Sequence, residues 1–221
     1  MRYGLCLTGG GAKGAYEAGI LKYFKEKGFN FSVVTGTSIG AVNGYFMLKN
    51  AYEEMYSFWL SMCMNKYFDS LNMVVENRRV IQELEKLEGY DNSIDSFYVN
   101  YVEVKGCSIS EVVVDIKNFD KEKALEAVKA SSLLPYNYDG EPDKVSAKIL
   151  FEQFKIDLQE GKYDGYKLDG GILNNCLLKP FINDRVDKIF IIALSNDFQV
   201  PEYIYQFYKK KTLLFYYLIL K

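Results

Sequence analysis

The sequence predicts an α/β fold, in which helices cover both faces of a central and mostly parallel β-sheet. The first observation is the order of the opening segments, since strand, glycine-rich loop, helix and strand follow one another through short connections. The second is that an apolar strand ending at Val33-Val34 runs into a G-x-S-x-G turn and then into a helix-compatible segment. A three-layer α/β/α domain is therefore expected.

Three elements are expected before this turn. A strand is predicted at Tyr3–Leu7 and a loop at Thr8–Gly14, because consecutive glycines adopt backbone conformations that other residues avoid. A helix is predicted from Ala15 to Lys27, and Gly28 ends it. The apolar face of this helix comprises Ala15, Ala18, Leu21 and Phe24.

The segment from Tyr45 to Phe68 is rich in aromatic residues and methionine. Helix faces packed on the sheet are expected here, and the alternative is that some of these side chains line a cleft for an acyl chain. Further elements are predicted as a helix at Val74–Leu87, strands at Phe97–Val104 and Glu111–Ile116, a helix at Lys121–Ala130 and a strand at Ile189–Leu194.

Three later segments have weaker patterns. A turn is expected at Tyr138–Pro142, and Lys144–Tyr166 is interpreted as an insertion or as a helix with a hairpin. The tail Lys209–Leu220 joins a lysine run to an apolar run. We expect it to dock on the core as a final helix or strand, and the alternative is a contact with a membrane surface.

The length of 221 residues is typical of one domain, with a motif-bearing core at 3–194 and a C-terminal extension at 195–221. The formal net charge of −2 and the scattered basic residues argue against nucleic acid as a partner. No signal-peptide pattern precedes the first strand, and no apolar run approaches the length of a membrane span. A cytoplasmic location, peripheral at membranes, is therefore expected.

The chain contains no histidine. A Ser-His-Asp triad is therefore impossible within it, and so is a histidine-ligated zinc site. If a serine is the nucleophile, another side chain must accept its proton.

Ser38 is the candidate nucleophile. It is the central residue of Gly36-Thr37-Ser38-Ile39-Gly40, where a tight turn between strand and helix would expose its hydroxyl. Side chains at Gly36 and Gly40 would collide with the neighbouring strand and helix. The helix that begins here would direct its free N–H groups and its positive dipole end toward the reacting centre.

Gly9, Gly10 and Gly11 are candidates for an oxyanion hole. Consecutive glycine N–H groups at the start of a helix can face the oxygen that becomes negative during acyl transfer. The loop also fits the G-x-G-x-x-G fingerprint of dinucleotide-binding proteins. That alternative requires an acidic residue at the end of the second strand, where this chain has Thr35-Gly36.

Asp169 is the candidate base. It follows a short apolar approach and precedes Gly170-Gly171, a pattern that also fits a plain Asp-Gly turn. A carboxylate is a weak base in water, so Asp169 would need a tuned environment and a direct hydrogen bond to Ser38.

Together these motifs resemble those of the patatin-like phospholipases. The resemblance spans roughly Tyr3 to Leu194 and is weak between Trp59 and Val112. It rests on Gly9-Gly10-Gly11-Ala12-Lys13-Gly14, Gly36-Thr37-Ser38-Ile39-Gly40, Ala130-Ser131-Ser132-Leu133-Leu134-Pro135 and Asp169-Gly170-Gly171 followed by Asn174-Asn175.

The resemblance implies a hydrolase of lipid acyl esters that uses a serine-aspartate dyad and neither metal nor cofactor. Ser38 would be the nucleophile and Asp169 the base, with Gly9, Gly10 and Gly11 as the oxyanion loop. The motif-supporting positions would be Lys13, Gly14, Gly36, Gly40, Gly170 and Gly171.

The expected substrate is a phospholipid or another acyl-ester lipid, reached through transient contact with a membrane surface. Nothing in the sequence indicates an oligomeric state. Two alternatives share the fold: a catalytically silent module that binds lipid or a partner, and an acyltransferase that uses the same site.

Overall fold

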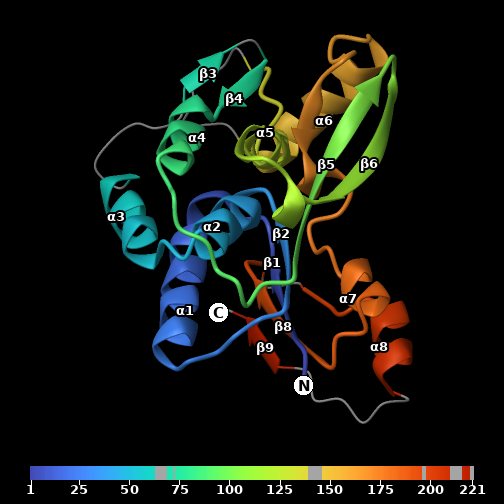
Figure 1. The fold of residues 1–221 in the computed structure, drawn as a ribbon. Coiled ribbons are helices and arrows are strands. Elements are labelled where there is room, and N and C mark those ends of the chain that lie inside the picture. The colour runs from blue at the N-terminus through green and yellow to red at the C-terminus, as the bar shows by residue number, and fades with distance from the viewer. Residues whose placement is uncertain (63–68, 72, 139–145, 196–197, 210–215, 220–221) are drawn as a thin grey trace.

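A mixed β-sheet forms the centre of the computed structural model, which describes residues 1–62, 69–71, 73–138, 146–195, 198–209 and 216–219. Within this part of the chain the sheet has seven strands in the order β6-β5-β2-β1-β8-β9, and β7 also pairs with β5 (Figure 1). Its strands are β1 (Tyr3–Leu7), β2 (Val33–Thr37), β5 (Ser96–Lys105), β6 (Ser108–Asp115), β7 (Lys167–Asp169), β8 (Lys188–Ala193) and β9 (Tyr216–Ile219). A separate two-stranded sheet pairs β3 (Asp69–Leu71) with β4 (Val74–Glu76).

The central strands β5, β2, β1, β8 and β9 run parallel, while β6 and β7 are antiparallel to β5. The helices are α1 (Gly14–Glu26), α2 (Ile39–Leu48), α3 (Tyr52–Met62), α4 (Arg78–Glu85), α5 (Lys121–Ser131), α6 (Ala147–Gln159), α7 (Lys179–Asn183) and α8 (Glu202–Lys209). This arrangement confirms the predicted α/β fold with a mostly parallel sheet.

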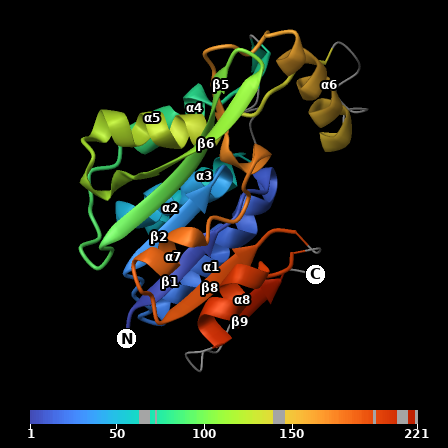
Figure 2. The ribbon, with the colours of Figure 1, turned by 90° about the vertical axis from the view of Figure 1, so that its right-hand side faces the viewer.

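Helices lie on both faces of the sheet. In Figures 1 and 2, α1, α2 and α3 lie on one face, whereas α7 and α8 lie on the other. Successive residues of β1 alternate between the two cores, because side chains in a strand point to opposite faces. Leu5 and Leu7 pack with α1 and α2, while Cys6 packs with Phe181 of α7 and Ile204 of α8.

Several predicted boundaries are confirmed, and two expectations are wrong. Val74–Glu76 is the strand β4, so the helix predicted from Val74 begins only at Arg78. On α1, Ala15 is exposed and Glu17 is buried in its place beside Ala18. A polar residue on the buried face of a helix is invisible to a pattern that counts only apolar residues.

The aromatic and methionine-rich segment packs into the core, as the first interpretation proposed. The buried core includes Tyr45, Phe46, Met55, Phe58 and Trp59. Residues 63–68 lie outside the described part of the chain.

The later segments resolve in part. Lys144–Tyr166 contains α6, and the tail contributes β9, which pairs in parallel with β8. Residues 139–142 of the turn predicted at Tyr138–Pro142, and most of the lysine run of the tail, lie outside the described residues. None of the helices in the described ranges has both the length and the apolar character that crossing a bilayer requires.

A buried polar cluster joins α1 to the two helices beside it. Asn43 of α2 donates from Nδ2 to Glu17 Oε1 at 2.9 Å and to the Gly14 carbonyl at 2.9 Å, and it accepts from Trp59 Nε1 at 2.9 Å. Burial raises the pKa of Glu17 well above its usual value, although the hydrogen bond from Asn43 opposes this shift. The hydrogen bonds of this cluster fix the start of α1 against α2.

Candidate active site

The ends of β2 and β7 meet on β5. Thr37, the last residue of β2, lies opposite Asn100, and Asp169, the last residue of β7, lies opposite Tyr101. Because β2 runs parallel and β7 antiparallel to β5, the two strands approach each other head to head. Asn100 and Tyr101 are adjacent residues of β5. Ser38, which follows Thr37, therefore lies next to Asp169.

Ser38 occupies the turn between β2 and α2. Its backbone has φ 56° and ψ −123°, a left-handed conformation that non-glycine residues rarely adopt and that costs about 1–3 kcal/mol. A Cβ at Gly36 would lie 2.7 Å from the Gly40 carbonyl oxygen, and one at Gly40 would overlap the Leu7 carbonyl. The two glycines of the motif are therefore required for α2 to pack this closely on the sheet.

The turn is also held from the side. The Ser38 N–H donates to Ser131 Oγ at 2.9 Å, and Ser131 is the last residue of α5 and fully buried. This bond satisfies one of the donors that the start of a helix leaves without a partner. Ser38 as a residue remains 8% exposed.

Asp169 is buried beside this turn. Its Oδ1 accepts from the Gly171 N–H at 2.7 Å, and its own N–H donates to the Leu133 carbonyl at 2.9 Å. Oδ2 is buried and has no hydrogen-bond partner among the described residues. Burial raises the pKa of Asp169 to about 6, although hydrogen bonding from the Ser38 side chain and from Gly171 opposes the shift.

The Ser38 hydroxyl thus stabilises the ionised carboxylate without making a hydrogen bond of full geometry to it. Such bonds are often long in enzymes without substrate and tighten when the substrate arrives. Asp169 Oδ2 is therefore the carboxylate oxygen that remains without a partner.

The glycine loop is held by Asn175. The Asn175 amide accepts from the Gly9 N–H at 3.0 Å and donates to the Gly9 carbonyl at 3.1 Å, so it pairs with both polar groups of this residue. The N–H groups of Gly10 and Gly11 have no partner among the described residues. The structure therefore leaves two of the three predicted oxyanion donors available, and Gly9 is engaged by the loop that carries Asp169.

Lys13 and Gly14 connect the loop to its surroundings. Lys13 Nζ donates to the Leu194 carbonyl at 3.0 Å, which ties the loop to the end of β8. Gly14 begins α1, and a Cβ there would lie 2.5 Å from Ile39 and 2.7 Å from Trp59. Lys13 and Gly14 therefore help to hold the glycine loop in place.

Buried Asn100 connects the two strand ends. Its Oδ1 accepts from Thr37 Oγ1 at 2.7 Å, and its Nδ2 donates to the Asn174 carbonyl at 2.8 Å and to Glu111 Oε1 at 3.0 Å. A Cβ at Gly170 would overlap the Asn100 carbonyl. The turn that bears Ser38 and the loop that follows Asp169 are thus fixed to the same side chain.

Ser38, Asp169 and the glycine loop open into one cavity of about 380 Å³. The other walls of this cavity are mostly apolar and come from β4, the segment after α5, the start of α6 and the loop after β7: Val75, Leu134, Pro135, Leu150, Phe151 and Ile172. The described residues of the 45–68 segment are absent from these walls, so the alternative that they line an acyl cleft here is wrong for that part of the chain.

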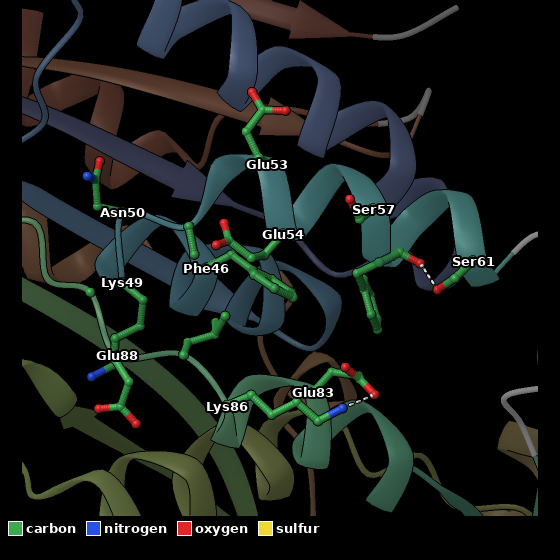
Figure 3. A pocket seen from close by; sticks show the side chains of 14 residues that line it. Phe46, Lys49, Asn50, Glu53, Glu54, Ser57, Ser61, Glu83, Lys86 and Glu88 are labelled. Atoms are coloured by element: carbon green, nitrogen blue, oxygen red, sulfur yellow. Dashed lines mark hydrogen bonds and ion pairs between the residues drawn. The ribbon is translucent and has the colours of Figure 1, made fainter.

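A larger cavity of about 890 Å³ lies between α3 and α4 (Figure 3). Charged side chains of both signs surround it, including Glu54 of α3, Glu83 of α4 and Lys86, which forms a 2.7 Å ion pair with Glu83. Neither Ser38 nor Asp169 lines it. The smaller cavity, with its apolar walls, is the one in which chemistry at Ser38 could take place.

Three supporting residues are absent from the predicted set of site residues. Ser131 and Asn175 lie in two of the segments that resemble the family, but the sequence alone assigns them no role. Asn100 lies inside an ordinary strand pattern. The A-S-x-x-x-P and Asn-Asn segments were therefore a usable signal for the first two. Nothing local marks Asn100, because its role depends on strand pairing.

A family model and a curated protein each match part of this chain. The family model described as patatin-like phospholipase matches residues 5–97, which confirms the resemblance over the glycine loop and the Ser38 turn. A stretch of 48 residues is 44% identical to lysophospholipase nte1 of Aspergillus terreus, and it covers 22% of this chain and 3% of that protein.

Solved structures with a similar fold include VipD from Legionella pneumophila, with a TM-score of 0.51 at 12% identity, covering 93% of this chain and 52% of VipD. The ExoU-SpcU complex from the type III secretion system of Pseudomonas aeruginosa gives a TM-score of 0.44 at 14% identity, covering 93% of this chain and 46% of the matched one. This chain thus spans about half of each. The likeness to VipD concerns the fold.

The buried carboxyl of Asp169 predicts a pH-dependent effect on stability. The pKa of Asp169 in the folded protein is raised to about 6. Its contribution to the free energy of unfolding is therefore complete below the unfolded pKa and is lost as pH rises through about 6. Asp169→Asn should therefore increase the free energy of unfolding at pH 8, by at most about 3 kcal/mol, and the gain should shrink toward pH 4. Urea denaturation at both pH values measures it.

Asp157→Asn is the control of opposite sign. Burial of Asp157 acts to raise its pKa, but hydrogen bonds from Lys162, Asn137 and Gln153 outweigh burial and lower it. Its contribution is present at neutral pH and lost as pH falls, so this variant should be less stable at pH 8. A loss of stability at pH 8 in Asp169→Asn would contradict the prediction.

Proposed function

We propose that this protein hydrolyses carboxylic esters of lipids, with Ser38 as the nucleophile and Asp169 as the base. One observation carries the proposal: Ser38, in its strained turn, and Asp169, whose buried Oδ2 has no hydrogen-bond partner, line the same mostly apolar cavity. The match to the patatin-like phospholipase model over residues 5–97 supports the same reaction class.

In the first step, Ser38 Oγ attacks the ester carbonyl and Asp169 Oδ2 accepts the hydroxyl proton. A pKa of about 6 leaves Asp169 mostly ionised at neutral pH and makes it a stronger base than an exposed carboxylate. The carbonyl oxygen becomes negative in the tetrahedral intermediate. When the intermediate collapses, the bond to the leaving alcohol breaks and Asp169 returns the proton to that alcohol.

The developing negative charge needs donors already in place. The Gly10 and Gly11 N–H groups are available for it, and α2 begins next to Ser38 with its positive dipole end toward the cavity. Asn175 would act as a positioning residue, because it fixes the Gly9 peptide next to these donors.

In the second step, water replaces the alcohol. Asp169 accepts a proton from water as the oxygen attacks the acyl-Ser38 carbonyl, and the same donors hold the new oxyanion. Collapse of this intermediate breaks the ester to Ser38, and the proton on Asp169 passes back to Ser38 Oγ. A fatty acid leaves and the enzyme is regenerated without a metal or cofactor.

The cavity indicates which part of the substrate it holds. Its walls at Val75, Leu134 and Phe151 suit an alkyl chain and offer no charge to a headgroup. A phospholipid, a lysophospholipid or another acyl ester would place its acyl chain here, taken up in transient contact with a membrane surface. We propose a single catalytic domain at the cytoplasmic side of that surface.

Ser38→Ala should lower ester hydrolysis by about 10⁴-fold, because the attacking atom is lost. Asp169→Asn should cause a similar loss, since a neutral amide cannot accept the proton. The measurement is hydrolysis of a short-chain p-nitrophenyl ester and of phospholipid vesicles. The Ser38 change leaves its N–H bond to Ser131 in place, so the variant should unfold at the same urea concentration as the wild type.

A fluorophosphonate probe separates the enzyme from a silent binding module. It should label the wild type and leave Ser38→Ala unlabelled. A folded wild-type protein that neither hydrolyses esters nor reacts with the probe would overturn the proposed function.

The pH profile should report Asp169. The carboxylate must be ionised to accept a proton, so kcat/KM should rise with pH along a limb centred near pH 6. Initial rates between pH 4.5 and pH 8, with the fold checked at each pH, measure this limb. A limb centred near pH 4 would mean that the base is an ordinary exposed carboxyl.

Asn175→Asp should lower kcat by about 100-fold with little change in KM, because a carboxylate cannot donate to the Gly9 carbonyl and its charge lies near the oxyanion. Asn118→Asp makes the same chemical change at an exposed position and should have no effect. Equal changes in KM and kcat, or a loss of stability alone, would contradict a positioning role for Asn175.

A further inference from the structure

A second groove, of about 420 Å³, lies between α5 and the hairpin formed by β5 and β6. Its residues lie within the described ranges and differ from those that line the Ser38 cavity, so it is a separate feature. We name it the α5 groove. Its apolar floor is formed by Tyr101, Val114, Phe119, Ala127, Ala130 and Leu133.

Positive charge predominates at the edge of the α5 groove. Lys123, Lys129 and Lys167 line it together with a single carboxylate, Glu126. Lys123 is neutralised by Asp120 at 3.0 Å. Among the described residues, Lys129 and Lys167 have no ion-pair partner, which leaves two ammonium groups beside an apolar surface.

Tyr101 adds a hydrogen-bond donor to this charge. Tyr101 lines the α5 groove and is 8% exposed as a residue, and its hydroxyl has no hydrogen-bond partner among the described residues. Lys167 Nζ lies over its ring at 5.4 Å from the centroid. The hydroxyl oxygen itself is not buried, so it can donate a hydrogen bond to an acceptor that binds in the groove.

We propose that the α5 groove binds an anionic amphiphile, a molecule with one negatively charged headgroup and an alkyl chain. The headgroup accepts a hydrogen bond from Tyr101 and pairs with Lys129 and Lys167. The chain lies on the floor at Ala127, Ala130 and Leu133, where small side chains leave room. A fatty-acid carboxylate and the phosphate of a lysophospholipid both have this chemistry.

The position of the α5 groove connects it to the base. Tyr101 is the strand partner of Asp169, and Lys167 lies two residues before Asp169 on β7 and points to the same face. The Leu133 carbonyl accepts the Asp169 N–H. A ligand held by Tyr101, Lys167 and Leu133 therefore contacts the backbone that positions Asp169. This site goes beyond the proposed function, because binding there does not require chemistry at Ser38.

Binding to wild-type protein tests the proposal directly. Laurate and dodecyl phosphate represent the two sources, with dodecanol and dodecylphosphocholine as uncharged and zwitterionic controls. Dodecanol is kept below its solubility limit and the other three below their critical micelle concentrations. Calorimetry should detect binding of at least one anion in preference to both controls. Removing both unpaired lysines, Lys129→Gln with Lys167→Gln, should weaken that binding by about tenfold or more.

Two further variants sharpen the result. Tyr101→Phe should weaken anion binding by about threefold to tenfold while leaving the unfolding midpoint unchanged, because the hydroxyl has no partner to lose. Lys148→Gln with Lys155→Gln removes the same charge from α6, beside the Ser38 cavity, and should leave the affinity unchanged.

A laurate analogue with a photoreactive diazirine locates the bound chain. In wild-type protein it should label peptides from Lys121–Leu133, in addition to any labelling at Leu150 and Phe151 in the Ser38 cavity. Labelling confined to the Ser38 cavity would overturn the proposal. So would an affinity that survives loss of both lysines, or no preference for anions over the controls. None of these outcomes bears on ester hydrolysis, which the Ser38→Ala assay tests separately.

Discussion

The backbone pairing of β5 is the constraint on which the candidate site depends. β5 pairs with β2 as far as Asn100 and with β7 from Tyr101, so two strands far apart in sequence end against neighbouring residues. Side chains alternate along a strand, and a slip of one residue in the β5–β7 register would move Asp169 to the opposite face of the sheet. The antiparallel direction of β7 is equally important, because it brings the end of that strand, rather than its start, to Ser38.

Buried polar side chains then convert this backbone arrangement into fixed loops. Ser131 accepts a hydrogen bond from the Ser38 N–H. Asn100 binds Thr37 at the end of β2 and Asn174 in the loop after β7, and Asn175 pairs with the N–H and the carbonyl of Gly9. Loops that carry chemistry cannot rely on ladder hydrogen bonds, so side-chain amides and hydroxyls supply the missing partners. Among the described residues of the site, the groups left without a partner include those that a reaction would use, namely the Gly10 and Gly11 N–H groups and Asp169 Oδ2.

The sequence predicted the features that local chemistry determines. The turn at Ser38, the glycine loop and the strand-helix order follow from residues close together in the chain, and they agree with the structure. Features that depend on distant pairing were not predictable: the role of Asn100, the engagement of the Gly9 N–H by Asn175, and the 3.5 Å approach of the Cys6 and Cys176 sulfur atoms. Glu17 was missed for another reason, since a carboxylic acid whose pKa is raised by burial occupies a helix position that an apolar pattern assigns to hydrophobic residues.

The environment of Asp169 also bears on the choice between an enzyme and a binding module. Burial raises the pKa of its carboxyl to about 6, and the ionised form present at neutral pH has one oxygen without a partner. This arrangement destabilises the fold relative to an asparagine, which would keep the Gly171 bond without carrying a charge. A module that used the cavity only to hold an alkyl chain would gain stability and lose nothing from that replacement. Proton transfer is the one role for which a buried, partly unsatisfied carboxylate beside Ser38 is better than an amide, and this favours hydrolysis over simple lipid binding.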